Sequence, residues 1–183
     1  MNKRLDREQW IGAALRAAAR HGIDGVRVER LAEELGVTKG SFYWHFKHRN
    51  ALLETVLEAW RARATNDIIG EVEARGGDPA ARLLHLIAIV GQGDGRLDQV
   101  IRTWAANDHT AARALAEVDR RRLDYLKTLF LGIGFQPSAA GARARLVYHA
   151  IIGQFTLSPP ASRRERLKEW LDVIYPMLVR RGR

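Results

Sequence analysis

The sequence predicts an all-α fold of about nine helices, and three observations support this. Nearly every stretch between glycines carries apolar residues at the three- and four-residue spacing of a helix. Only five prolines occur in the 183 residues. No segment alternates polar and apolar residues as a half-buried strand would. We therefore expect helices joined by short turns.

The first three predicted helices are short. Apolar residues over 10–18 give the first, which Gly22 closes. Residues 31–35 form a second that stops at Gly36, because glycine has no Cβ to clash at the positive φ of a tight turn. Thr38 begins the third, and its hydroxyl oxygen can accept a hydrogen bond from the free N–H groups there.

Six longer helices follow, each marked by apolar residues at helical spacing. These residues fall within 52–60, 83–90, 97–104, 115–129, 146–154 and 167–178. Start and stop signals separate the helices, with glycines as stops and Asp-Pro or serine as starts. The signals are Gly76-Gly77, Asp78-Pro79, Gly91, the glycines of 132–134, Ser138 as cap of the eighth helix, Ser158-Pro159-Pro160 and Ser162.

Composition limits the classes of function. The formal net charge of +9 favours a polyanionic partner, either nucleic acid or an anionic membrane surface. There is no cysteine, which excludes disulfides, zinc–thiolate sites and cysteine nucleophiles. The N-terminus has no apolar run after its basic residues, and no apolar stretch is long enough to span a membrane. We expect a cytoplasmic protein with no cofactor and no metal site.

The stretch "TKGSFYWHFKHRNALL", residues 38–53, sets an aromatic cluster in a basic frame. Phe42 and Phe46 are four residues apart and share a helix face, which predicts that they are core. Tyr43 and Trp44 lie away from that face and can meet a partner. Gly40 costs helix stability, roughly 1 kcal/mol relative to alanine, which suggests that something approaches the backbone there.

The longer segment "VERLAEELGVTKGSFYWHFKHRNALLETVLEAW" resembles the N-terminal DNA-binding module of the TetR (tetracycline-repressor) family of bacterial regulators. The matching core is L-A-x-x-L-G-V-T-x-G-x-x-Y-x-H-F over residues 31–46. The resemblance is close over about residues 8–60 and elsewhere extends only to helical organisation. It implies a two-fold homodimer that places one helix-turn-helix on each half of a palindromic DNA operator.

By position, the resemblance implies phosphate contacts from Tyr43, His45 and Arg49, and contacts to bases or nearby backbone from Lys39, Ser41 and Trp44. The implied DNA-binding set is Arg27, Thr38, Lys39, Gly40, Ser41, Tyr43, Trp44, His45 and Arg49. Two positions depart from the family pattern. Arg27 stands where a hydroxyl residue usually caps the second helix, and His48 stands where a small polar cap is usual.

The predicted division is a helix-turn-helix domain at 1–50 and a helical effector-binding and dimerisation domain at 51–183. An unknown small-molecule effector would contact apolar walls with a few polar groups. The candidate pocket residues are His85, Trp104, Asn107, Tyr125, Tyr148, His149 and Phe155. The last two helices are expected to form a four-helix bundle across the dimer. The candidate interface residues are Leu146, Ala150, Gly153, Leu167, Trp170, Leu171 and Ile174.

The leading interpretation is a ligand-released repressor, and three alternatives compete with it. One is a DNA-binding protein without a small-molecule effector, which acts through a protein partner or as an architectural factor. An enzyme is disfavoured because the chain lacks H-E-x-x-H and G-x-S-x-G patterns, and because Arg96 stands where a dinucleotide loop needs its third glycine. A membrane-surface protein is disfavoured because the N-terminal helices have no strongly basic face opposite an apolar one.

Overall fold

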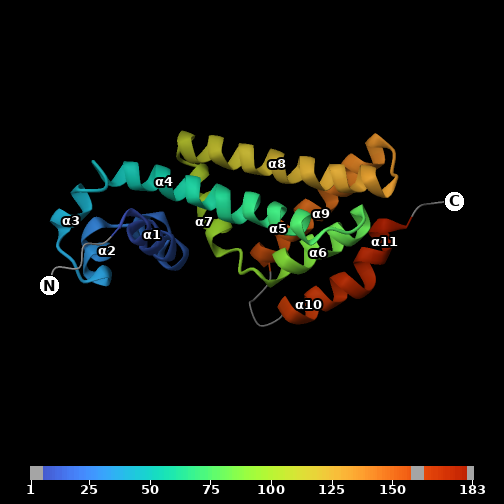
Figure 1. Ribbon diagram of the computed structural model, residues 1–183, viewed down its shortest axis with the longest axis horizontal. Coiled ribbons are helices and arrows are strands. Elements are labelled where there is room, and N and C mark those ends of the chain that lie inside the picture. The colour runs from blue at the N-terminus through green and yellow to red at the C-terminus, as the bar shows by residue number, and fades with distance from the viewer. Residues whose placement is uncertain (1–5, 158–162, 181–183) are drawn as a thin grey trace. The chain divides into compact units, whose positions relative to one another are not determined.

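The computed structural model describes residues 6–157 and 163–180, and these are helical throughout apart from turns. Within them lie eleven α-helical segments and no strand. Two π-helical segments, Ala62–Asn66 and Trp170–Ile174, join four of the α-helical segments into two longer helices. The described residues therefore form the nine helices of the predicted all-α fold (Figure 1).

The chain packs as two compact units, which are described separately. Unit 1 consists of residues 1–63 and 96–116, and unit 2 of residues 64–95 and 117–183. Neither unit is one continuous segment. The predicted division into a domain at 1–50 and a domain at 51–183 stays a prediction.

Unit 1 is built around its first helix, α1. This helix begins with a reciprocal capping box between Asp6 and Gln9 and ends at Gly22, which has φ 72°. Trp10 is fully buried in the unit's core, and Leu97 and Trp104 of α7 pack against that core. The elements are α1 (Arg7–His21), the 3₁₀ turn η1 (Ile23–Gly25), α2 (Val28–Leu35), α3 (Lys39–Tyr43), α4 (Arg49–Arg61), α7 (Arg96–Ala105) and the first residues of α8 (His109–Ile133).

Unit 2 has its own core, which includes Leu83, Phe130, Val147 and Trp170. Its elements are α5 (Asp67–Arg75), α6 (Pro79–Gln92), the remainder of α8, α9 (Pro137–Leu157), α10 (Arg163–Glu169), the second π segment and α11 (Tyr175–Val179). Asp78 caps α6 as predicted, because its Oδ1 accepts from the N–H of Ala81 at 2.8 Å. Because α6 continues to Gln92, the glycines after it are no dinucleotide loop.

The predicted fourth helix is continuous from Arg49 to Arg75 but is not regular. Its middle is the π segment Ala62–Asn66, in which one turn holds more residues than an α-turn. Arg122 of α8 donates to the carbonyl oxygen of Ala64 and to the hydroxyl of Thr65, both at 3.1 Å. These bonds satisfy polar groups at the widened turn.

Two boundaries need comment. Ser138 does not cap the eighth helix, because α9 already begins at Pro137 and the N–H of Ala140 donates to the carbonyl oxygen of Gln136 at 2.8 Å. Proline is suited to a first helical position because its φ is already helical and that position needs no N–H. The predicted break at 158–160 and the start at Ser162 lie outside the described residues. In the part that the structure describes, no helix has the length and hydropathy needed to cross a membrane.

Candidate nucleic-acid interface

Helices α2 and α3 form a helix-turn-helix in unit 1. The turn depends on Gly36, whose φ of 67° and ψ of 36° are left-handed, a conformation that glycine adopts without strain. After it, the N–H of Val37 donates to the carbonyl oxygen of Ala32 at 3.0 Å. Ala32 is buried, and its small side chain lets α2 lie close to its neighbours. The local structure agrees with the expectation from the sequence.

Two phenylalanines hold the motif to the core. Phe42 and Phe46 are buried and stacked with their ring centroids 5.4 Å apart. The indole of Trp10 meets Phe42 edge to face at 5.4 Å, and the Arg7 guanidinium lies 5.1 Å from the centroid of Phe46. The predicted core role of these two phenylalanines is confirmed.

The other aromatic side chains of the cluster point outward. Tyr43 is 56% exposed at the end of α3, and Trp44 is 84% exposed just after it. Thr38, Lys39 and Gly40 are also exposed, whereas Ser41 and His45 are half-buried. The surface of α3 and the residue after it therefore presents the Lys39 ammonium, the backbone at Gly40 and the rings of Tyr43 and Trp44. These groups suit contacts to phosphates and bases.

Gly40 has room for a larger residue within the chain itself. A Cβ added there would meet only the hydroxyl oxygen of Thr38, at an ordinary 3.6 Å. The folded chain therefore supplies no reason for glycine at this exposed position. The close approach of an external partner to Gly40 stays a prediction.

Lys39 has a partner that the sequence reading missed. Its ammonium forms an ion pair with the carboxylate of Glu29 on α2, and both side chains are more than half exposed. The hydrogen bond from Lys39 lowers the pKa of Glu29, and the same bond raises the pKa of Lys39. An acceptor-only group therefore lies beside the main donor of α3. The two residues are ten apart in sequence and lie on different helices, so no helical spacing indicates their contact.

The helix caps differ in part from expectation. The Thr38 side chain makes no capping bond, so its predicted capping role is wrong in this structure. Arg27 precedes α2 without a side-chain cap, and its Nε instead donates to the carbonyl oxygen of Asp24 at 3.2 Å. His48 does cap α4, because its Nδ1 accepts from the N–H of Ala51 at 3.1 Å. The histidine thus caps the helix at the position where the resemblance implies a small polar residue.

Arg49 is anchored inside unit 1. Its Nε donates to the carbonyl oxygen of Val26 and its Nη2 to that of Ile23, both at 2.6 Å. It therefore fixes the start of α4 to the turn that leads into α2. A guanidinium has five N–H donors, so phosphate contact through the remaining ones stays a prediction.

The seven candidate pocket residues are divided between the two units. Trp104 and Asn107 line a hollow in unit 1, whereas the other five belong to unit 2. Tyr125 donates to Glu73 at 2.7 Å and Tyr148 to Asp119 at 2.5 Å. Burial and then the Glu73 hydrogen bond raise the pKa of Tyr125. The remaining three are His85 with a buried Nδ1, the exposed His149, and Phe155 on a small cleft of unit 2.

The seven candidate interface residues fall into two groups. Leu146 on α9 is 61% exposed, and Ala150 and Gly153 follow it at helical spacing, although Ala150 is also partly buried against the core of unit 2. Trp170 is only 9% exposed and belongs to the core of unit 2. Leu167, Leu171 and Ile174 are partly buried against that same core. The large apolar residues left exposed in the described part of the final helix are Val173 and Met177, and on α9 they are Leu146 and Leu157.

Comparison with known proteins gives a consistent picture. The model of a family described as bacterial regulatory proteins, tetR family, matches residues 11–56, from α1 into α4. The tetracycline repressor protein class C of Escherichia coli is 48% identical over 59 residues, which make up 32% of this chain and 26% of that repressor. The chain therefore matches about a quarter of that relative's length.

Two further similarities extend along nearly the whole chain. The tetracycline repressor protein class G of Vibrio anguillarum is 28% identical over 173 residues, covering 93% of this chain and 77% of the relative. The structure of a transcriptional regulator from Rhodococcus sp. Rha1 has a TM-score of 0.77 at 22% identity and covers 96% of each chain. At that identity the structural likeness shows a shared fold.

Proposed function

We propose that the chain, which matches the TetR family of bacterial regulatory proteins over residues 11–56 and is similar to tetracycline repressors, is a DNA-binding repressor of transcription in the cytoplasm. It acts as a homodimer on a palindromic operator, and a small-molecule effector releases it. Regulators of this family are not enzymes. The observation that carries the proposal is the surface of α3, where Lys39, Tyr43 and Trp44 are exposed on a helix-turn-helix held by buried phenylalanines.

The DNA contacts follow from this surface. Tyr43 and His45 serve phosphate oxygens, and Lys39 with Ser41 meets base edges in the major groove, where each base pair presents its own pattern of donors and acceptors. Trp44 offers a flat apolar face to sugar or base. The net charge of +9 adds sequence-independent attraction to the phosphates.

The homodimer rests on apolar surface that unit 2 leaves uncovered. Leu146, Val173 and Met177 are each more than half exposed. Leu146, Ala150, Gly153 and Leu157 recur at four- and three-residue spacing, so they share one face of α9. Two copies that pair these surfaces would form a four-helix bundle. A two-fold axis there gives each operator half-site one α3.

Selection of bound genomic fragments, followed by footprinting, tests the proposal. We expect a protected site with dyad symmetry whose half-sites are about one helical turn apart, roughly 34 Å, or somewhat more. In a repeated selection, Lys39→Ala and Ser41→Ala should change the preferred bases. Unselective binding, or a footprint without symmetry, would favour the architectural alternative. An unchanged motif with Lys39→Ala would remove that residue's base-reading role.

A further inference from the structure

We propose that Arg7 is a positioning residue, which holds the DNA-facing surface of α3 in place by joining Phe46 to Thr55 of α4. Arg7 is the first residue of α1. Its guanidinium lies 5.1 Å from the centroid of the Phe46 ring, and its Nη2 donates to the hydroxyl oxygen of Thr55 at 2.9 Å. All three residues belong to unit 1. The contacts rest on that unit alone, whereas an effect on DNA binding rests on the proposed function.

Helix α3 needs support from outside itself. It has only five residues, and helices shorter than about 12 residues are not stable alone in water. Support comes from Phe42 in the helix and from Phe46 just after it, both of which are buried. The N–H groups of His45 and Phe46 donate to the carbonyl oxygen of Phe42, at 2.9 and 3.0 Å. A shift of Phe46 would therefore move Phe42 and, with it, the exposed side chains of α3.

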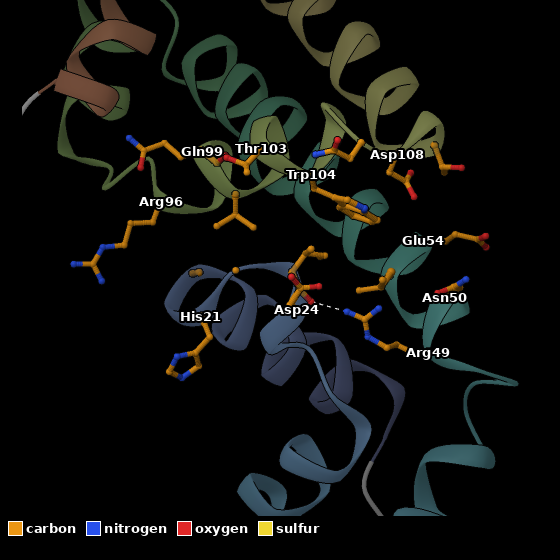
Figure 2. A pocket seen from close by; sticks show the side chains of 17 residues that line it. His21, Asp24, Arg49, Asn50, Glu54, Arg96, Gln99, Thr103, Trp104 and Asp108 are labelled. Carbon is orange, nitrogen blue, oxygen red and sulfur yellow. Dashed lines mark hydrogen bonds between the residues drawn. The ribbon is translucent and has the colours of Figure 1, made fainter.

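The other end of the connection, Thr55, is fixed in α4. Thr55 is 7% exposed, and its hydroxyl group donates to the carbonyl oxygen of Ala51 at 3.0 Å while it accepts from Arg7. Helix α4 itself is held at its start by Arg49, whose side chain points toward the η1 turn in Figure 2. Arg7 therefore ties Phe46 to a helix that is anchored independently.

Arginine suits this position because of its shape. A planar guanidinium can lie over an aromatic ring and donate hydrogen bonds along its own plane at the same time, whereas the ammonium of lysine is a compact charge. The backbone of Arg7 is also fixed, because the capping box at the start of α1 spans it. The N–H of Gln9 donates to Oδ1 of Asp6 at 2.8 Å, and the N–H of Asp6 donates to Oε1 of Gln9 at 3.0 Å. A lysine would keep the charge but would not make both contacts.

Amide hydrogen exchange on the free chain tests the anchoring without DNA. Arg7→Met should speed exchange of the His45 and Phe46 amides about two- to fivefold, because local opening of the turn after α3 becomes easier. Arg7→Lys should do the same. The amide of Val37, which bonds within the turn before α3, should keep its rate. If all three amides speed up alike, Arg7 supports only overall stability and the proposal is wrong.

Binding measurements test the consequence for DNA, as the ratio of the affinity for the selected operator to the affinity for random duplex DNA. Arg7→Met and Arg7→Lys should each lower this ratio about two- to fivefold, while the slope of log affinity against log salt stays unchanged. In the Thr55→Val background the effect of Arg7→Met should shrink, because the connection to α4 is already absent. Arg20→Met changes an exposed arginine on the same helix. It is the matched control and should leave the exchange rates and the ratio unchanged.

The alternative is a phosphate contact by Arg7, which predicts different results. Arg7→Met would then lower the salt slope by about one unit, Arg7→Lys would largely restore affinity, and the Thr55→Val background would make no difference. Any of these outcomes would overturn the proposal, as would an affinity ratio that does not change. A chain that shows the expected exchange rates but selects no operator would support the anchoring by Arg7 and remove the proposed function.

Discussion

Arg49 has two possible uses, and the structure gives evidence for one of them. Its short bonds to the carbonyl oxygens of Ile23 and Val26 hold the turn that precedes α2. The resemblance to the family implies a phosphate contact, for which N–H donors remain. The two uses predict different responses to salt, because only a phosphate contact releases counterions from DNA.

Arg49→Ala should lower the free energy of unfolding by about 2 kcal/mol, since it removes part-buried hydrogen bonds from a charged donor. Operator affinity should fall equally for all sequences, while the slope of log affinity against log salt stays unchanged. Denaturant titration and binding at several salt concentrations measure both effects. Arg30→Ala, an exposed arginine of α2, is the stability control. A variant of normal stability whose salt slope falls by about one unit would identify Arg49 as a phosphate contact instead.

Glu29→Gln should raise affinity for non-cognate DNA about two- to fivefold, because it removes a negative charge from the DNA-facing side and frees Lys39. Discrimination between operator and random sequence should fall. Lys39→Met and the double variant Glu29→Gln with Lys39→Met complete a double-mutant cycle, which isolates the contribution of the Glu29–Lys39 interaction to DNA affinity. If Glu29→Gln has the same effect in the Lys39→Met background, the two side chains act independently and the ion pair has no role in DNA binding.

At the scale of single residues, the sequence predicted which side chains share a helix face, but it did not predict their hydrogen-bond or ion-pair partners. The four-residue interval between Phe42 and Phe46 was enough to assign them to the core and to leave Tyr43 and Trp44 outside. Nothing comparable identified Glu29, which reaches Lys39 only because the turn at Gly36 brings α2 and α3 together. The partners of Arg49 are backbone carbonyls, and these carry no sequence signal at all.

Helices were predicted well as elements and less well in their interior geometry. The apolar stripe through 52–60 gave no sign of the π segment Ala62–Asn66. A π turn is defined by its backbone hydrogen bonds, which span five residues instead of four, and no residue type marks that change. The stripe in the last helix likewise indicated an apolar face for Trp170, and this face is used within unit 2. Periodicity predicts that a helix face is buried. It does not distinguish burial within the same chain from burial against a second copy.

The turn at Gly95 packs closely against Phe155 of α9, and this contact allows a test by substitution. Gly95 has φ 63°, and a Cβ there would lie 2.3 Å from the Phe155 ring. Gly95→Ala should therefore destabilise the protein by about 2 kcal/mol or more, from overpacking and left-handed strain together. Gly70→Ala in α5 meets no atom within 4 Å and should instead stabilise by up to about 1 kcal/mol. Thermal unfolding of both variants measures these opposite changes in stability. Similar melting temperatures would contradict the packing of Gly95 against Phe155.

For the whole molecule, the dimer surface stays a prediction, to which the exposed Val173 and Met177 are added as candidates. Val173→Asp with Met177→Asp should yield folded monomers, because pairing the two copies would bury unpaired charges at a cost of several kcal/mol. Sedimentation should show the change, and operator affinity should fall with it. Leu131→Asp, an exposed apolar position on α8, should remain dimeric. A dimer that survives the double substitution would place the two-fold axis elsewhere.

Trp170→Ala separates packing from association. Because Trp170 is buried in the core of unit 2, its truncation should cost about 3 to 5 kcal/mol of stability. Chain that remains folded should still dimerise. Monomers of normal thermal stability would instead restore Trp170 to the interface.

The discontinuity of unit 1 bears on how such a protein can be recombined. The family signature ends at residue 56, yet the core around Trp10 also uses Leu97, Val100 and Trp104, which return to it after a separate excursion of the chain. A helix-turn-helix segment cut at residue 56 would lack Leu97, Val100 and Trp104, and the apolar core that they cover would be exposed. Chimaeras that transplant only residues 1–63 should therefore express poorly unless the recipient supplies a compatible seventh helix. To transfer DNA binding to another protein, a chimaera should contain all of unit 1, which is residues 1–63 together with residues 96–116.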